Sequence, residues 1–132
     1  MLPVFYAGPA SCESVFKLSD LSGDQRAELF TQVGLYGELT ALLNYCQRPP
    51  DIIAKLTPIV QGCVEEESFA AVKDRYNTAV VNASGRYECV GPGARKKIPE
   101  FEDKIARIIS GMATACRLRS FYRLSFPKIN PP

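Results

Sequence analysis

The sequence predicts an all-α fold, a single small bundle of about four helices with up-and-down connections. Four segments carry apolar residues at every third or fourth position, which is the spacing of one face of a helix. Proline, glycine and acidic clusters separate these segments, so the connections should be short. A chain of 132 residues with 46% apolar content can also bury one core without a metal or a cofactor to hold it.

The first predicted helix covers residues 24–46 and is expected to be the central one. Ser22 and Gln25 have the spacing of a capping box at its start. Apolar residues form three stripes along this helix, which indicates burial on most sides. Gly34 and Gly37 interrupt the apolar pattern, and we interpret them as points of close helix packing and not as a ligand site.

The second predicted helix covers 50–66 and the third covers 68–88. Pro58, in the middle of the second helix, predicts a kink or a break. The glutamates at 65–67 are expected to form a solvated turn, because consecutive residues point in different directions around a helix. Ser68 is then placed to cap the third helix, whose apolar residues recur by threes and fours.

The segment 90–97 is predicted to be a loop, and Pro99 is predicted to open a fourth helix over 99–119. The loop would bring glycines, basic residues and a helix N-terminus together, which are the ingredients of an anion-binding site. The basic residues are Arg95, Lys96 and Lys97. Because the residue order of a phosphate-binding loop is missing, a plain connection is the favoured interpretation.

The five cysteines predict two disulfides. The chain has neither a C-x-x-C pair nor a histidine, so a metal site and a thioredoxin-type redox centre are not expected. In an up-and-down bundle, Cys46 and Cys89 fall at one end and Cys63 and Cys116 at the other. We therefore expect the pairs Cys46–Cys89 and Cys63–Cys116, with Cys12 left over or competing for the second pair. Buried free thiols in a cytosolic protein are the alternative.

We divide the chain into an N-terminal arm over residues 1–21, a helical domain over 22–120 and an extended tail over 121–132. Gly8 and Ala10 have the spacing of a signal-peptidase site, so the arm is either the remnant of a trimmed signal or a chance match. The predicted disulfides favour an oxidising compartment, and we expect a periplasmic or secreted protein. No apolar run approaches the roughly 18–20 residues that cross a bilayer, so no membrane span is expected.

Basic residues are concentrated towards the C-terminus. Residues 91–132 carry nine Lys or Arg against three Asp or Glu, whereas residues 1–90 carry seven against eleven. A basic and aromatic end is the type of surface that binds an acidic protein partner. The predicted contact residues are Arg117, Arg119, Phe121, Tyr122, Arg123, Phe126 and Lys128. In the alternative interpretation, the arginines only complement the helix dipole and the phenylalanines cover the bundle.

The residue content argues against an enzyme. A chain without histidine lacks the commonest general base near neutral pH.

We expect a non-enzymatic exported protein that acts through protein–protein contacts, such as a periplasmic adaptor, an inhibitor, an immunity-type protein or a secreted effector. One alternative is a carrier of a small apolar ligand in the bundle core. Another is polyanion or nucleic-acid binding through the basic C-terminal third, for which a recognisable motif is missing. No cofactor is expected.

Overall fold

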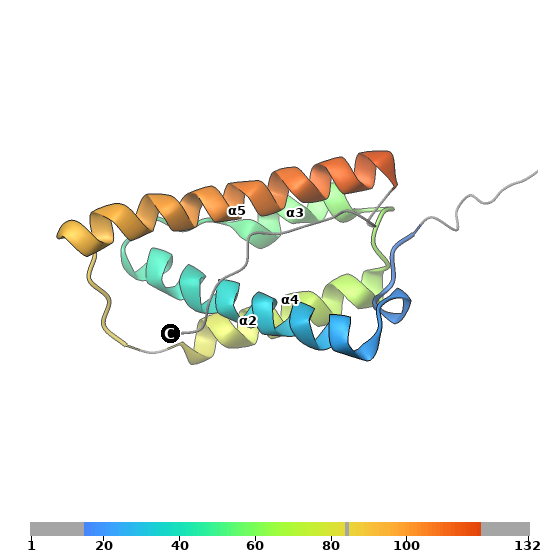
Figure 1. The fold of residues 1–132 in the computed structure, drawn as a ribbon, viewed down its shortest axis with the longest axis horizontal. Helices are drawn as coiled ribbons and strands as arrows, with labels where there is room; N and C mark the ends of the chain where they lie inside the picture. Colours follow the sequence, from blue (N-terminus) through green and yellow to red (C-terminus); the bar gives the residue numbers. More distant parts are fainter. Residues whose placement is uncertain (1–14, 84, 120–132) are drawn as a thin grey trace, which may run out of the picture.

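The computed structural model describes residues 15–83 and 85–119 and shows an all-α bundle (Figure 1). Its elements are the 3-10 turn η1 (Leu18–Asp20) and the α-helices α2 (Gly23–Tyr45), α3 (Ile52–Val60), α4 (Glu66–Asn82) and α5 (Pro92–Leu118). Within these described ranges, β-type pairing is limited to a single parallel bridge between Phe16 and Val64. The predicted fold class is confirmed.

The four helices form two pairs. α2 packs along α4, and α3 packs along α5 (Figure 1). Each connection, over residues 46–51, 61–65 and 83–91, crosses from one pair to the other. Successive helices run in opposite directions, so the predicted up-and-down topology is confirmed.

The start of α2 has the predicted capping box. The Ser22 hydroxyl accepts a hydrogen bond from the Gln25 amide at 3.1 Å, and the Gln25 side chain accepts one from the Ser22 amide at 2.8 Å. The first amides of a helix have no partner within the helix, so this reciprocal pair stabilises the N-terminus.

The second helix is shorter than predicted and passes through Pro58 without a break. α3 begins at Ile52, directly after Asp51 in the left-handed region with φ 53°, and ends at Val60. The predicted break is therefore wrong, and the alternative, a kink at Pro58, stays a prediction. Proline at this position removes the helical partner of one carbonyl only, that of Ala54. Packing of α3 along α5 holds the helix together despite that loss.

Ser68 lies inside α4 and attaches the N-terminal segment to it. α4 begins at Glu66, so the predicted turn at 65–67 is wrong, although Glu66 and Glu67 are solvent-exposed as expected. These acidic side chains lie in the first turn, at the positive end of the helix dipole. The buried Ser68 hydroxyl accepts a hydrogen bond from the Leu18 amide at 2.9 Å and donates one to the Glu65 carboxylate at 2.7 Å. Ser68 thus links η1 to α4 and does not act as the predicted cap.

The boundary between the third and fourth helices differs most from the prediction. α4 ends at Asn82 and α5 begins at Pro92, where residues 88 and 99 were expected. Proline suits the first turn of a helix, because the amide it lacks has no helical partner there. Pro99 lies inside α5, so the loop predicted over 90–97 is wrong from Pro92 onwards.

The core is centred on Leu43, which is fully buried. Side chains from all four helices belong to the same buried cluster, namely Tyr36, Leu39, Ile52, Tyr76, Ala94, Ile98 and Ile105. The hydroxyl oxygens of Thr40 and Tyr76 lie 2.6 Å apart inside the α2–α4 contact and share a hydrogen bond. This bond satisfies two polar groups that would otherwise be buried without a partner.

α2 and α4 approach each other closely at Gly37. A Cβ atom on this residue would lie 2.6 Å from the Cβ of Ala79 and 2.7 Å from the carbonyl oxygen of Tyr76. At Gly34, the side chain of Arg75 fills the space that a Cβ would need. Both glycines are points of close packing, as the sequence predicted.

Both predicted disulfides are present. Cys46–Cys89 joins the α2–α3 connection to the α4–α5 connection, with a Cα–Cα distance of 5.4 Å. Cys63–Cys116 joins the α3–α4 connection to α5, with a Cα–Cα distance of 5.6 Å. In the chain-entropy model, cross-links of this span each stabilise a fold by roughly 4 kcal/mol. Cys12 lies outside the described residues.

Replacement of Gly37 by alanine is expected to destabilise the bundle. The new Cβ would overlap the backbone of α4, so the two helices must move apart, which lowers the free energy of unfolding by about 1–3 kcal/mol. Gly23→Ala is the matched control, because nothing lies within 4 Å of a Cβ at that position. Urea denaturation measures both variants. Equal stabilities would contradict the close approach at Gly37.

The stability of the bundle is expected to fall above about pH 10. Burial raises the pKa of Tyr36 to about 12. Burial also raises the pKa of Tyr76, against an opposing effect of the Thr40 hydrogen bond and with a further increase from the charge of Asp51. Below about pH 10 both hydroxyls keep their protons in the folded and unfolded states. Above it the unfolded chain loses them first, so the free energy of unfolding decreases as the pH rises towards about 12.

Urea midpoints measured at about pH 8, 10 and 11 test this pH dependence. The Tyr36→Phe variant lacks one of the two groups and should show a shallower decline above about pH 10. A midpoint that stays constant over this range in the unmodified protein would show that the two hydroxyls are not held in a buried, neutral state.

Candidate functional site

At one end of the bundle, α2 and α4 finish and α5 begins (Figure 1). Large apolar side chains close to these helix ends in the sequence are exposed. Tyr45 is 51% exposed, Val81 80% and Val90 79%. Elsewhere in the described chain, only Leu118 is a large hydrophobic residue of comparable exposure. Exposed apolar side chains that lie together are typical of surfaces that contact other molecules, and the rings of Tyr45 and Tyr87 are in contact here. We call Tyr45, Val81, Tyr87 and Val90 the apolar end.

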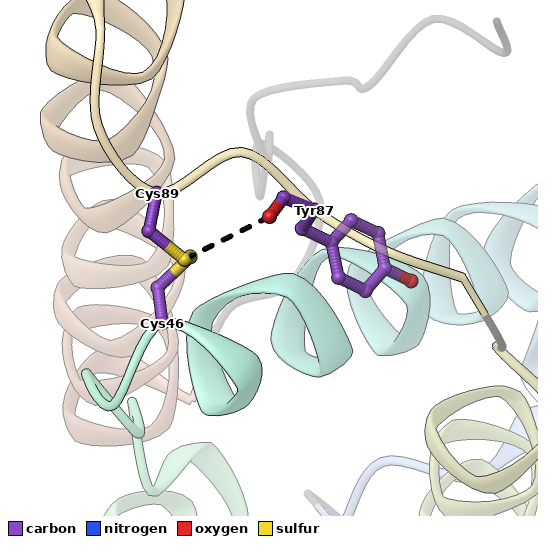
Figure 2. Close-up of a disulfide and its surroundings, with 3 residues drawn as sticks. All are labelled: Cys46, Tyr87 and Cys89. Carbon is purple, nitrogen blue, oxygen red and sulfur yellow. Dashed lines mark hydrogen bonds between the residues drawn. A yellow bond between two sulfur atoms is a disulfide. The ribbon is translucent and has the colours of Figure 1, made fainter.

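The Cys46–Cys89 disulfide links the chain segment that carries Tyr45 to the one that carries Tyr87 and Val90. Figure 2 shows this disulfide beside Tyr87. Tyr45 precedes Cys46, while Tyr87 and Val90 lie on either side of Cys89. The rings of Tyr45 and Tyr87 meet edge to face, with centroids 5.6 Å apart, a favoured geometry for aromatic pairs. The Cys89 sulfur lies 4.0 Å from the Tyr87 carbonyl oxygen, and because a disulfide sulfur carries no proton, we treat this as a contact and not as a hydrogen bond.

The structure places the predicted anion-binding residues on a helix and not in a loop. Arg95, Lys96 and Lys97 lie in the first two turns of α5 and are exposed, while Ala94 and Ile98 on either side of them are buried. Three consecutive helical residues point in three directions, so their charges do not converge on one site. The anion site was predicted on a loop over 90–97 followed by a helix start at Pro99, and both of these structural predictions are wrong. Anion binding itself stays a prediction.

Of the predicted partner-binding residues, the structure describes Arg117 and Arg119, which are both exposed. Arg119 ends α5 in the left-handed conformation with φ 54°, and its guanidinium donates a hydrogen bond to the Gly62 carbonyl at 2.7 Å. It thereby connects the end of α5 to the α3–α4 connection, one residue from Cys63, which is a structural role. The other predicted residues, Phe121, Tyr122, Arg123, Phe126 and Lys128, lie outside the described part of the chain.

An open groove of about 510 Å³ lies between the α2–α3 connection and α5, with Lys55 of α3 also in its lining. Its lining includes the apolar side chains of Ile105 and Ile109 and an ion pair in which the Arg48 guanidinium donates two hydrogen bonds of 2.9 Å to the Glu102 carboxylate. These hydrogen bonds and the charge of Glu102 raise the pKa of Arg48. A carrier of an apolar ligand needs a site that encloses most of the ligand, and this groove is open to solvent.

Neither a group of metal-ligating side chains nor a membrane-spanning helix is found among the described residues. No three cysteine, aspartate or glutamate side chains in these ranges are grouped to hold a metal ion. Among the same residues, no helix combines the length and the apolar content needed to cross a lipid bilayer.

Comparison with protein-family models, curated proteins and solved structures gives no match to this chain. Function must therefore be inferred from the residues and their geometry.

Sequence patterns did not single out the apolar end, although one signal for it was present. Tyr45, Tyr87 and Val90 each lie within two residues of Cys46 or Cys89. The predicted pairing of these cysteines already implies that the three side chains are neighbours. Their exposure depends on how the helices pack, which a local pattern does not show.

Arg119→Ala is expected to lower the free energy of unfolding by about 0.5–1.5 kcal/mol, because the hydrogen bond to the Gly62 carbonyl is lost. Arg117→Ala is the control, and a change within about 0.5 kcal/mol is expected for this exposed side chain. Urea denaturation distinguishes the two. A larger loss of stability for Arg117→Ala than for Arg119→Ala would show that Arg117, and not Arg119, makes the stabilising contact at the end of α5.

Proposed function

We propose that this chain is an exported, non-enzymatic protein that acts by binding another protein through the apolar end. The observation that carries this proposal is the exposure of Tyr45, Val81 and Val90 at one end of a disulfide-linked bundle. Moving apolar surface out of water is favourable by about 25 cal/mol per Å², so a partner that covers these side chains gains binding free energy. Tyrosine is also among the residues that contribute most to protein interfaces.

The apolar end is held in place before any partner binds. The disulfide Cys46–Cys89 and the edge-to-face contact of Tyr45 with Tyr87 fix the spacing of side chains that lie more than 40 positions apart in the sequence. Association costs less conformational entropy when the contact residues are already ordered. Side chains that are ordered in this way suit a surface that binds a partner better than a connection that only contacts solvent.

The charges next to the apolar end favour an acidic partner. The exposed cations of residues 83–98 are Arg86, Arg95, Lys96 and Lys97, whereas Glu88 is the acidic residue of this segment. Complementary charge steers a partner towards a surface and raises the rate of association. Arg117 and Arg119 lie at the opposite end of α5, so these two arginines belong to a separate candidate surface.

The proposed compartment is the periplasm or the extracellular space. Two disulfides are compatible with an oxidising compartment, because cytosolic thiols are normally kept reduced. A protein partner in the same compartment follows from this proposal.

Site-specific crosslinking tests the proposed contact. With p-benzoylphenylalanine in place of Tyr45 in the full chain, irradiation in the source cells is expected to give a discrete protein adduct. The same photoreactive residue in place of Glu100, which is exposed on α5, serves as the control and is expected to give none. An adduct at position 100 but not at position 45 would contradict the assignment.

Substitution of the apolar end is expected to weaken binding of the crosslinked partner. Tyr45→Ser combined with Val90→Ser should raise the Kd at least about tenfold, which corresponds to about 1.4 kcal/mol, with the circular dichroism spectrum unchanged. Leu118→Ser, at the other end of the bundle, is the matched control and should leave the Kd unchanged.

Truncation after residue 120 separates the apolar end from the basic C-terminal surface. We expect the truncated chain to keep its partner. If truncation abolishes binding while the Tyr45 and Val90 substitutions do not, the tail is the contact surface and the apolar end is not. Recovery of nucleic acid that is lost steeply between low and physiological salt would instead favour the polyanion alternative.

A further inference from the structure

The two disulfides differ in how much protein surrounds them. Cys63 is 2% exposed and Cys116 is 9% exposed, whereas Cys46 and Cys89 are both partly exposed. We propose that Cys46–Cys89 is a reversible modification site, opened by dithiol reductants while the rest of the fold stays intact, and that Cys63–Cys116 is a permanent structural link.

The surroundings of Cys63–Cys116 block the approach of a reductant. The Cys63 amide donates to the Val60 carbonyl and the Cys63 carbonyl accepts from the Phe16 amide, both at 2.9 Å. Cys116 lies within the hydrogen-bonded turns of α5, and Arg119 binds the Gly62 carbonyl beside Cys63. Thiol–disulfide exchange requires a thiolate to reach one of the two sulfurs, so this bond can be reduced only after the surrounding structure opens.

The surroundings of Cys46–Cys89 are less restrictive. Cys46 follows the last turn of α2, and Cys89 lies in the non-helical connection over 83–91 (Figure 2). Within residues 85–90, no backbone group is hydrogen-bonded to another described backbone group. This connection can therefore move locally without breaking the helices on either side, and local movement is what exposes a sulfur to attack.

The exchange reaction balances with a dithiol as the co-substrate. One thiolate of the dithiol attacks the sulfur of Cys46 or Cys89, forms a mixed disulfide and displaces the other cysteine as a thiolate, which takes up a proton. The second thiol of the reductant then attacks the mixed disulfide and releases the remaining cysteine. The protein gains two thiols, and the reductant leaves as a disulfide after giving up two electrons and two protons. A dithiol protein of the thioredoxin type or a small-molecule dithiol supplies this chemistry.

Opening this bond would change the apolar end, a consequence that rests on the proposed function. The disulfide is the covalent link between Tyr45 on one side and Tyr87 and Val90 on the other. Once it opens, the connection over 83–91 is held to α2 by the Tyr45–Tyr87 ring contact alone among the contacts described for these residues. We therefore expect a partner that binds the apolar end to dissociate from the reduced protein.

The order of reduction tests the modification site without any partner. The full chain carrying Cys12→Ser is treated with dithiothreitol under native conditions, quenched with N-ethylmaleimide at increasing times and mapped by mass spectrometry. The expected first product carries labels on Cys46 and Cys89 only and forms at least about tenfold faster than label appears on Cys63 and Cys116. A first product labelled on Cys63 and Cys116, or one labelled on all four, would overturn the proposal.

Two matched variants exclude an intrinsic difference in reactivity. Cys63→Ser with Cys116→Ser retains the first disulfide, and Cys46→Ser with Cys89→Ser retains the second. In concentrated urea the two remaining bonds should be reduced at similar rates, whereas in native buffer only the first should be reduced quickly. Equal rates in native buffer, with both variants folded by circular dichroism, would also overturn the proposal. If a variant does not fold, the labelled products of the Cys12→Ser chain still decide the order.

Failure of the proposed function has a different signature. If no partner contacts the apolar end, the order of labelling is unaffected, because it is measured on the isolated chain. If the order of labelling is wrong but the Tyr45 and Val90 substitutions weaken binding, the contact surface stands and its control by thiols does not.

Discussion

The fold depends on helix packing within two pairs, and disulfides link the connections through which the chain crosses between these pairs. α2 packs on α4 and α3 packs on α5, and each of the three connections between these pairs contains a disulfide-bonded cysteine. Cys46–Cys89 ties two of the connections together at one end, and Cys63–Cys116 ties the third to α5 at the other. Side chains around Leu43 then fill the space between the pairs. Tight packing within a pair and covalent closure between pairs thus act on different parts of the bundle.

Much of this fold could be predicted from local patterns. The apolar stripes gave the four helices, the capping box gave the start of α2, and the alternation of helix direction was enough to pair the four bonded cysteines correctly. The start of α5 was misplaced because Pro92 and Pro99 both satisfy the local rule for a first helical turn. The buried Ala94 and Ile98 extend the inward stripe of Ile105 by steps of four and seven residues, a signal that favours Pro92.

Other features depend on contacts that no local pattern contains. Ser68 looked like a helix cap, but its hydroxyl binds the Leu18 amide, 50 positions earlier in the chain. Arg119 looked like part of a partner surface, and its guanidinium binds the Gly62 carbonyl, 57 positions away. The basic residues near the C-terminus could be recognised directly in the sequence. The exposure of Tyr45 and Val90 could not, because it results from how the helix ends meet. The sequence placed the candidate contact surface at the basic C-terminal end, much of which lies outside the described residues. From the structure, we place it at the apolar end.

The cysteine pairing of the native protein tests this description of the fold most directly. Protein isolated without reductant is alkylated, digested without reduction and analysed by mass spectrometry for cross-linked peptides. We expect one cross-linked pair that contains Cys46 and Cys89 and a second that contains Cys63 and Cys116. Peptides that join Cys46 to Cys63 or to Cys116, or four cysteines that all carry the alkyl group, would contradict the closure of the bundle at its two ends.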